Sequence, residues 1–235
     1  MQLEKILQSQ GLGTRKACRS LIRSGQVSLS GRWITDPFSD WEPNQLQFSV
    51  GELVFVYRKT ANLVMNKPAG FECSQRPRHH PSVYSLLPPY LQQRGVQAVG
   101  RLDEDTTGLL VLTDDGALNH ALTSPRRKIE KIYSVTLCHP TQPALLEALS
   151  TGVLLHDSPD LVQAVACNPV GTHTLHLTLR EGRYHQVKRM VAAAGNRVSA
   201  LERIQVGHFH LPKSLLPGQW TWLETEDVEA LLGSR

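Results

Sequence analysis

The segment AVGRLDEDTTGLLVLTDDG, residues 98–116, is the most informative part of this chain. It contains five carboxylates, although lysine and arginine outnumber aspartate and glutamate in the whole chain by 25 to 21 and give a net charge of +4. A basic balance favours a polyanionic partner without proving one. The acidic cluster therefore needs a local chemical explanation.

The residues around the first acids suggest such an explanation. Arg101 and Asp103 are two positions apart, so their side chains point to the same side if the segment is extended. A guanidinium beside a carboxylate favours the ionised form, whereas Glu104 and Asp105 add like charge. The following Thr-Thr-Gly suits a turn, and residues 114–116 are most simply a turn after the apolar run. The segment thus predicts one carboxylate presented at the end of a strand.

Two other uses of these acids are less consistent with the sequence. A Mg²⁺ or Ca²⁺ site needs several converging oxygens, but the segment lacks the twelve-residue calcium-loop spacing, and no histidine pair with metal spacing accompanies it. A glycosidase needs a second carboxylate facing the first, and adjacent residues on a strand diverge. We therefore expect no metal site, and glycan cleavage is a weaker alternative.

Length and cysteine usage limit the class of protein. The 235 residues suffice for a real core and allow one domain or a small module followed by a larger one. The four cysteines form no CxxC pair, no apolar run reaches the length of a membrane span, and the amphipathic N-terminus does not resemble a secretory signal. These features predict a reduced, cytoplasmic protein that does not contact a membrane.

The first sixty residues or so form a predicted module of their own. Leu3, Ile6 and Leu7 recur at helical spacing, Thr14 can cap a second helix that Gly25 ends, and QVSLSGRWITD alternates like a strand, a turn and a strand. Basic residues fall largely off the apolar stripe of the second helix. Taken alone, that face is more simply a solvated surface than an RNA contact.

Beyond this module, strand-like and helical runs alternate. GLLVLTDDG, KIYSVTLC and THTLHLTLREG read as strands, and PALLEALSTG and RYHQVKRMVAAAG as helices. The chain is therefore predicted to be α+β, with a mixed, mainly antiparallel sheet flanked by helices after the small N-terminal module. We place the boundary so that the domains are residues 1–58 and 59–235.

Two resemblances give these parts a function. TRKACRSLIRSGQVSLSGRWITDPFSD resembles an S4 domain, a small module that grips the phosphates of folded RNA. GRLDEDTTGLLVLTDDG resembles the signature of pseudouridine synthases, in the branch that modifies ribosomal RNA and carries an N-terminal S4 domain. NLVMNKPAGFECS, LTSPRRKIEKIYSVTL and LREGRYHQVKRMVAAAGNRV resemble further motifs of the same family in order and spacing. Together they cover nearly the whole chain.

The resemblance implies roles for particular residues. Asp103 matches the catalytic aspartate, Tyr133 the active-site tyrosine, and Lys188 the basic residue that lies against the aspartate, with Arg189 as the alternative. RNA contacts are implied for Arg101, Arg183, Arg189, Lys5, Arg15, Lys16, Arg19, Arg23 and Arg32. The isomerisation needs no redox agent or group donor, so no cofactor is expected.

The same resemblance implies the substrate. The expected reaction is site-specific conversion of uridine to pseudouridine in small-subunit (16S) ribosomal RNA, at position 516 in the usual rRNA numbering. Naked ribosomal RNA and an assembling 30S particle are both possible partners, and the family implies a monomer. Two alternatives stay open: a pseudouridine synthase for another ribosomal RNA site, and an inactive S4-domain protein that binds ribosomal RNA or assists ribosome assembly.

Overall fold

The computed structural model describes residues 1–156 and 159–233. Backbone contacts group these residues into two compact units. The first unit combines Met1–Ala61 with Leu87–Gln97 and Thr113–Asp115, and the second contains the other described residues. No helix in the described part of the chain is both long enough and apolar enough to cross a bilayer.

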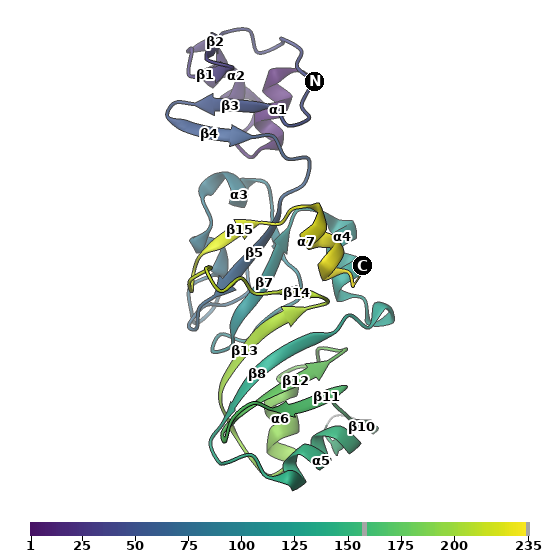
Figure 1. Cartoon of the computed structure of the whole chain (residues 1–235). Coiled ribbons are helices and arrows are strands. Elements are labelled where there is room, and N and C mark those ends of the chain that lie inside the picture. Colours follow the sequence, from purple (N-terminus) through teal and green to yellow (C-terminus); the bar gives the residue numbers. More distant parts are fainter. Residues whose placement is uncertain (157–158, 234–235) are drawn as a thin grey trace. The chain divides into compact units, whose positions relative to one another are not determined.

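The first unit begins with two short helices and a small sheet, as the sequence predicts (Figure 1). Helix α1 spans Leu3–Ser9 and α2 spans Arg15–Arg23, and the Thr14 hydroxyl accepts a hydrogen bond from the Ala17 amide at the start of α2. The apolar residues of both helices pack on the buried ring of Phe48. The antiparallel strands lie in the order β2 (Arg32–Ile34), β1 (Val27–Leu29), β3 (Gln47–Val50) and β4 (Leu53–Val56).

An arginine network ties the rest of the first unit together. Arg94, which follows helix α3 (Pro89–Gln93), donates to the Asp114 carboxylate at 2.8 Å and to the Gln10 side-chain oxygen at 3.0 Å. The other Asp114 oxygen accepts from the Ala61 amide at 2.6 Å. The sequence interpretation of residues 114–116 as only a turn is therefore incomplete, because Asp114 is also a structural ion-pair partner.

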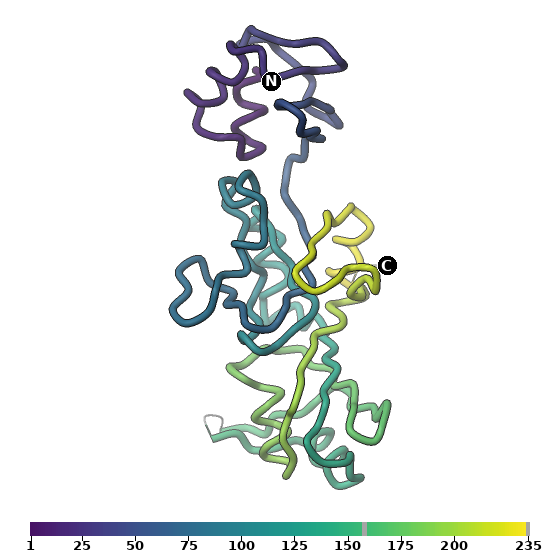
Figure 2. The backbone as a smooth tube through the Cα atoms, turned by 90° about the vertical axis from the view of Figure 1, so that its left-hand side faces the viewer, coloured from purple at the N-terminus to yellow at the C-terminus, as the bar shows by residue number. Residues whose placement is uncertain are grey.

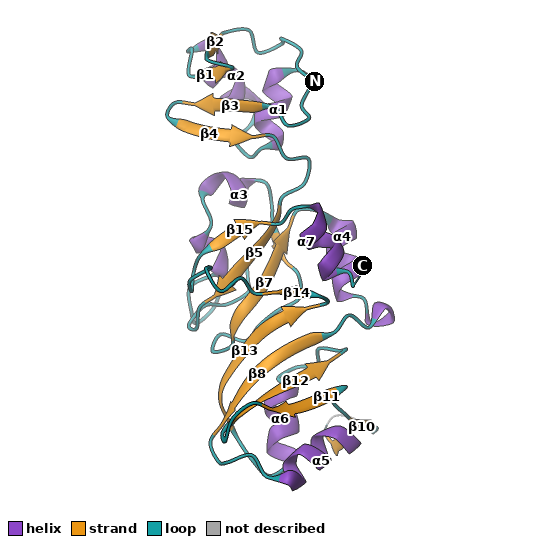
Figure 3. Cartoon of the chain, viewed as in Figure 1, coloured by secondary structure: helices purple, strands orange, loops and turns teal. Residues whose placement is uncertain are grey.

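The second unit is organised around a nine-stranded sheet, whose strands are orange in Figure 3. The pairs β11–β12, β12–β8, β8–β13 and β5–β15 run antiparallel, and β13 and β7 run parallel. The sheet is therefore mixed and mainly antiparallel, as predicted. Its strands lie in the order β11 (Ala166–Pro169), β12 (Thr174–Leu179), β8 (Lys131–Leu137), β13 (Val198–Val206), β7 (Thr107–Thr113), β5 (Asn62–Lys67) and β15 (Trp220–Trp222), with β14 (Phe209–His210) beside β13 and β6 (Gln97–Ala98) beside β7.

Helices flank this sheet near both ends (Figure 1). Helices α4 (Gly116–Thr123) and α7 (Thr225–Leu231) lie near the β5–β15 end, and α5 (Pro143–Thr151) and α6 (Gln186–Ala193) near the β11–β12 end. The segment after β5, blue in Figure 2, stands out from the sheet as a loop. The short elements are two 3-10 turns (Val83–Leu86 and Pro125–Arg127) and a separate strand pair, β9 (Val153–Leu154) and β10 (Leu161–Val162).

Glycine allows two strands of the sheet to approach each other closely. Gly108 in β7 has a φ of +97°, and a Cβ at this position would overlap the carbonyl oxygen of Arg203 in β13. Only glycine adopts such a conformation without strain, and only glycine leaves this space. Thr107 and Gly108 thus belong to β7, whereas the sequence suggested that Thr-Thr-Gly forms a turn.

Candidate active site

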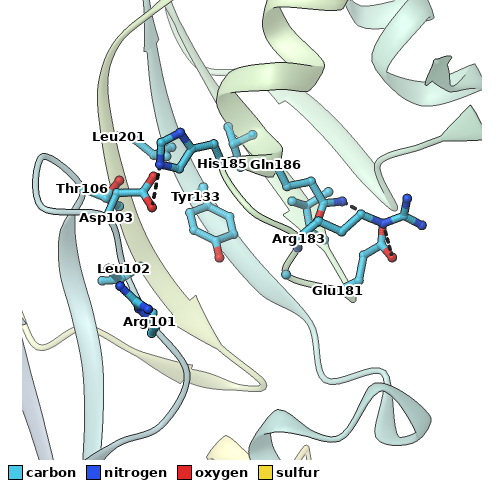
Figure 4. A pocket seen from close by; sticks show the side chains of 13 residues that line it. Arg101, Leu102, Asp103, Thr106, Tyr133, Glu181, Arg183, His185, Gln186 and Leu201 are labelled. Atoms are coloured by element: carbon cyan, nitrogen blue, oxygen red, sulfur yellow. Dashed lines mark hydrogen bonds and ion pairs between the residues drawn. The ribbon is translucent and has the colours of Figure 1, made fainter. Parts of the chain in front are cut away.

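Asp103 lies at the edge of a cavity of about 90 Å³ in the second unit (Figure 4). Strand β6 ends at Ala98 and β7 begins at Thr107, so Asp103 lies in the loop that leads into β7. The walls of the cavity come from this loop, from β8, from the end of β12, from the start of α6 and from β13. Residues from distant parts of the sequence thus converge on one carboxylate.

Lys188 is the cation nearest to Asp103. Its Nζ lies 3.0 Å from Asp103 Oδ2 and 2.6 Å from Asp105 Oδ1. The side chains of Lys188 and Asp103 are both 25% exposed. Of the two basic residues considered from the sequence, the structure brings Lys188 to Asp103, whereas Arg189 donates to the Tyr184 carbonyl at 3.2 Å.

The charges of this cluster stabilise one another. Burial disfavours the charged form of Lys188, but its hydrogen bonds to Asp105 and Asp103 outweigh this effect and raise the lysine pKa. Burial likewise opposes ionisation of Asp105, but the hydrogen bond from Lys188 and the charge of the same lysine together with smaller contributions outweigh it, so the Asp105 pKa is lowered. The sequence suggested only that Asp105 adds like charge next to Asp103. The structure shows in addition that both carboxylates share Lys188.

His185 is a site residue that the sequence reasoning missed. Its Nε2 lies 3.4 Å from Asp103 Oδ1, and its ring stacks on the exposed ring of Tyr184 with centroids 3.9 Å apart. His185 has a φ of +47° at the start of α6, which turns its side chain away from the helix and towards Asp103 (Figure 4). The available signal was its place three residues before Lys188, because the two side chains share one side of the helix that the sequence predicts there.

Tyr133 on β8 forms the wall next to Asp103 (Figure 4). Only 8% of this residue is exposed. It also lines a second cavity of about 270 Å³, which lies next to the first and shares Arg101, Glu181 and Gly182 with it. The tyrosine ring therefore lies between two adjoining cavities.

A buried lysine fixes the loop that carries Asp103. Lys67 is 0% exposed, and its Nζ donates to the carbonyl oxygens of Pro68 at 3.0 Å, Glu104 at 3.1 Å and Thr106 at 2.9 Å. Burial lowers the Lys67 pKa, and the neighbouring acids only partly oppose this shift. The Lys-Pro-Ala-Gly turn after β5 thus holds the residues on both sides of Asp105, a function that its sequence alone did not reveal.

The predicted RNA-binding arginines near the site have different environments. Arg101 is exposed and lines both cavities. Arg183 Nε lies 3.2 Å from Glu181 Oε2, and the Arg183 amide donates to the Gln186 side chain at 2.8 Å. Arg183 is therefore part of an ion pair beside the cavity rather than only a solvated charge.

The predicted RNA-binding residues of the first unit fall into two groups. Glu4, whose side chain is 2% exposed, forms an ion pair with Arg19 and lies 4.0 Å from Arg15. The Arg19 guanidinium also lies over the Phe38 ring, 5.1 Å from its centroid. These two arginines therefore have structural partners. The other predicted residues are exposed, namely Lys5, Lys16, Arg23 and Arg32.

A basic loop borders the other side of Asp103. The Glu72 carboxylate accepts hydrogen bonds from the backbone amides of Arg78, His79 and His80, and the amides of His79 and His80 contribute most to lowering its pKa. These residues line a groove of about 430 Å³ that also includes Asp103. Glu72 thus orders a positively charged edge next to the catalytic candidate.

Comparison with known proteins shows to which family the chain belongs. A family model described as RNA pseudouridylate synthase matches residues 62–193. The ribosomal small subunit pseudouridine synthase A of Yersinia pestis is 38% identical over 98% of both chains, and that of Escherichia coli (strain K12) is 35% identical over 99% of this chain and 100% of its own. A crystal structure of a pseudouridylate synthase matches with a TM-score of 0.70 and 31% identity, over 98% of this chain and 99% of that chain. The chain therefore belongs to the RNA pseudouridylate synthase family.

Proposed function

We propose that this protein converts one uridine of small-subunit (16S) ribosomal RNA to pseudouridine, with Asp103 as the catalytic carboxylate and position 516 as the target. The relatives from Yersinia pestis and Escherichia coli are named for the small ribosomal subunit and match this chain over nearly its whole length. The observation that carries the proposal is the placement of Asp103 at a cavity, 3.0 Å from Lys188 and beside the Tyr133 ring.

The reaction conserves all atoms of the nucleotide. The bond between N1 and C1′ breaks, the uracil turns, and a bond between C5 and C1′ forms. The C5 proton leaves and N1 gains a proton, so no oxidant and no group donor takes part. In this proposal Asp103 acts at the sugar as a nucleophile or a base.

The neighbours of Asp103 have separate parts in this proposal. Lys188 supplies the counter-charge that a partly buried carboxylate requires. The Tyr133 ring stacks on the uracil, and its hydroxyl helps to remove the C5 proton. Tyr133 lines the cavity that Asp103 borders, and Lys188 donates a hydrogen bond to Asp103 itself, which supports these roles.

RNA structure must bring the uridine to this cavity. A stacked base has to be extruded from the RNA, which costs roughly a few kcal/mol. We assign part of the compensating binding energy to residues 1–58, acting as an S4-like RNA-binding domain, and the chemistry to residues 59–235. We further propose that the protein acts in the cytoplasm as a monomer, on ribosomal RNA or on an assembling 30S particle.

A pair of aspartate variants tests the catalytic assignment. Asp103→Asn should abolish pseudouridine formation in unmodified 16S ribosomal RNA while RNA affinity stays within a few fold, because the change removes the reactive charge and barely alters shape. Asp105→Asn removes the same charge from the same lysine, so it is the matched control and should retain measurable turnover. Equal turnover by Asp103→Asn and the parental enzyme would refute the assignment.

Mapping the modified nucleotide separates the remaining possibilities. Pseudouridine at position 516 supports the proposed target, and pseudouridine elsewhere identifies a synthase for another ribosomal RNA site. Tight RNA binding without any pseudouridine, on both naked RNA and assembling particles, would instead indicate an inactive binding or assembly protein.

A further inference from the structure

The second cavity, about 270 Å³ in volume, contains more positive charge than its surroundings neutralise. Four cationic side chains line it, namely Arg101, Lys131, Arg180 and Arg203, against the single carboxylate of Glu181. Glu181 is already engaged, because its oxygens accept from Arg183 Nε at 3.2 Å and from Gln186 Nε2 at 2.8 Å. The cavity is therefore positively charged.

Two of these cations, the buried Arg203 and the half-buried Lys131, have only backbone partners among the described residues. Arg203 is 4% exposed, and its Nε donates to the Leu109 carbonyl at 2.8 Å. Lys131 Nζ donates to the Ile129 carbonyl at 3.1 Å. In the described part of the chain, neither residue forms an ion pair with a carboxylate, whereas Arg180 at the same cavity pairs with Glu130 at 2.7 Å.

An uncompensated buried charge is costly, and a guanidinium cannot release its proton to avoid that cost. The effect is visible at Lys131, where burial and the nearby charge of Arg203 lower the pKa to about 8. An anion in the cavity would relieve both residues at once. Each also retains N–H groups beyond its one backbone bond that can donate to an anion.

The strand register places this pair next to the reaction site. Arg203 on β13 lies directly opposite Tyr133 on β8, and Lys131 is two residues before Tyr133 on the same side of that strand. Tyr133 and Arg101 form walls of both cavities. A strand of RNA that places its uridine against Tyr133 therefore passes close to Lys131 and Arg203.

We propose that Lys131 and Arg203 form a phosphate-binding subsite, which takes a backbone phosphodiester of the RNA close to the extruded uridine. The proposal rests on the proposed function only in taking RNA as the molecule that supplies the phosphate. The unpaired charges and the cavity favour an oxyanion whichever uridine is modified. The subsite holds the RNA backbone next to the reaction cavity. The phosphate is therefore bound at the same time as the uracil base is extruded into that cavity.

Lys131→Met tests the subsite, because methionine keeps the length of the side chain and removes its charge. Lys213→Met, at an exposed position of the same unit, is the matched control. RNA affinity should fall about tenfold or more in Lys131→Met, as expected for a lost hydrogen bond to a charged group. The slope of log affinity against log salt should become shallower by about 0.7, the value for one phosphate contact in single-stranded RNA.

Neutral methylphosphonate linkages then identify the phosphate. One replaced linkage near the target uridine should weaken binding to the parental protein and have no further effect on Lys131→Met. In a separate arm without RNA, inorganic phosphate should raise the thermal unfolding temperature of the parental protein and of Lys213→Met, but not that of Lys131→Met. Since this arm requires no turnover, it stays informative even if the RNA is not modified.

Several outcomes would overturn the proposal. The first is that Lys131→Met binds RNA with the same affinity and salt dependence as the Lys213→Met control. The second is that every methylphosphonate linkage weakens RNA binding equally in the parental protein and in Lys131→Met. A response to inorganic phosphate without any sensitive linkage would mean that the cavity binds a free ion, and would refute the RNA assignment. Arg203→Gln should reproduce the Lys131→Met results, and unfolding of that variant would leave the decision to Lys131→Met.

Discussion

The substitution Lys67→Met should separate the stability of the active-site loop from its chemistry. Lys67 is fully buried and donates to three backbone carbonyls, two of which belong to the loop around Asp105. Methionine preserves the volume and removes all three donors. The Glu104 carbonyl keeps one partner, because the Gly70 amide also donates to it at 2.8 Å. The carbonyls of Pro68 and Thr106 lose the donor that Lys67 supplied.

The expected loss of stability follows from these contacts. Leaving a buried carbonyl unsatisfied costs about 1–3 kcal/mol, which applies in full to Thr106 and in part to the half-buried Pro68, while methionine avoids the cost of burying an ammonium. We therefore expect the free energy of unfolding to fall by about 2–4 kcal/mol. For a chain of this size, each kcal/mol corresponds to roughly 2–4 °C in the unfolding temperature. The loss should be several degrees or more, and Lys213→Met should show none.

Activity supplies the second measurement for Lys67→Met. A loop that misplaces a catalytic group by about 1 Å can lose about a hundredfold in rate, whereas contacts with RNA outside the loop are unaffected. Turnover at saturating RNA, measured well below the unfolding temperature, should fall by this order while the RNA Kd stays within a few fold. Unfolding within 1 kcal/mol of the parental protein, together with full turnover, would show that these bonds do not hold the loop.

Three further predictions concern other parts of the molecule. Tyr133→Phe should bind RNA normally and lose about a hundredfold to ten-thousandfold in turnover, the usual value of acid–base assistance, whereas Tyr133→Ala should also bind more weakly; parental turnover by Tyr133→Phe would limit the residue to stacking. The pKa of Lys131 is about 8 in the folded protein, against an ordinary value of 10.5. Between pH 8 and 10.5 the unfolded chain therefore binds more protons than the folded chain, so the free energy of unfolding rises with pH in this range. Denaturation at several pH values should show that the free energy of unfolding of the parental protein rises by up to about 3 kcal/mol relative to that of Lys131→Met. If the two proteins show parallel dependence on pH, the prediction is wrong. Replacing exposed Lys16 or Arg23 by Gln should flatten the salt dependence of RNA binding without loss of stability. In contrast, Arg19→Gln should destabilise the first unit, because Glu4 loses its ion pair with Arg19. Unchanged salt dependence in all three variants would argue against RNA binding by this module.

Local patterns in the sequence predicted the elements whose signals lie within a few residues. The apolar spacing of Leu3, Ile6 and Leu7 and the capping hydroxyl of Thr14 predicted the first two helices. The alternation in KIYSVTL predicted β8, whose burial alternates from Tyr133 onward. Such signals depend on neighbours at fixed spacing, so they survive without knowledge of the tertiary fold.

The start of α6 was less predictable. The sequence favours a helix through all of RYHQVKRMVAAAG, but α6 begins only at Gln186. His185 adopts a left-handed conformation that is uncommon for residues other than glycine. The contact with Asp103, which is far away in the sequence, helps to stabilise such a conformation, and a local pattern does not encode it.

Partners far apart in the sequence were visible only in part. The resemblance suggested that Lys188 faces Asp103, but no motif indicated that Asp105 shares the lysine. The ion pair of Arg94 with Asp114 was equally hidden, because it joins a loop after one helix to the residues before another. These contacts depend on the order of strands and on loop paths, which residue spacing along one segment does not determine.

The separate partners of the acids explain how a carboxylate cluster can serve an enzyme for a polyanion. Asp105 is held by Lys188 and Asp114 by Arg94, so neither presents a free negative charge to an approaching RNA strand. Asp103 itself lies between Lys188 and His185, with exposed Arg101 at the same cavity. In the proposed function, these cations reduce the repulsion between RNA phosphates and the Asp103 carboxylate. The acidic segment thus places the proposed catalytic carboxylate next to positive charge.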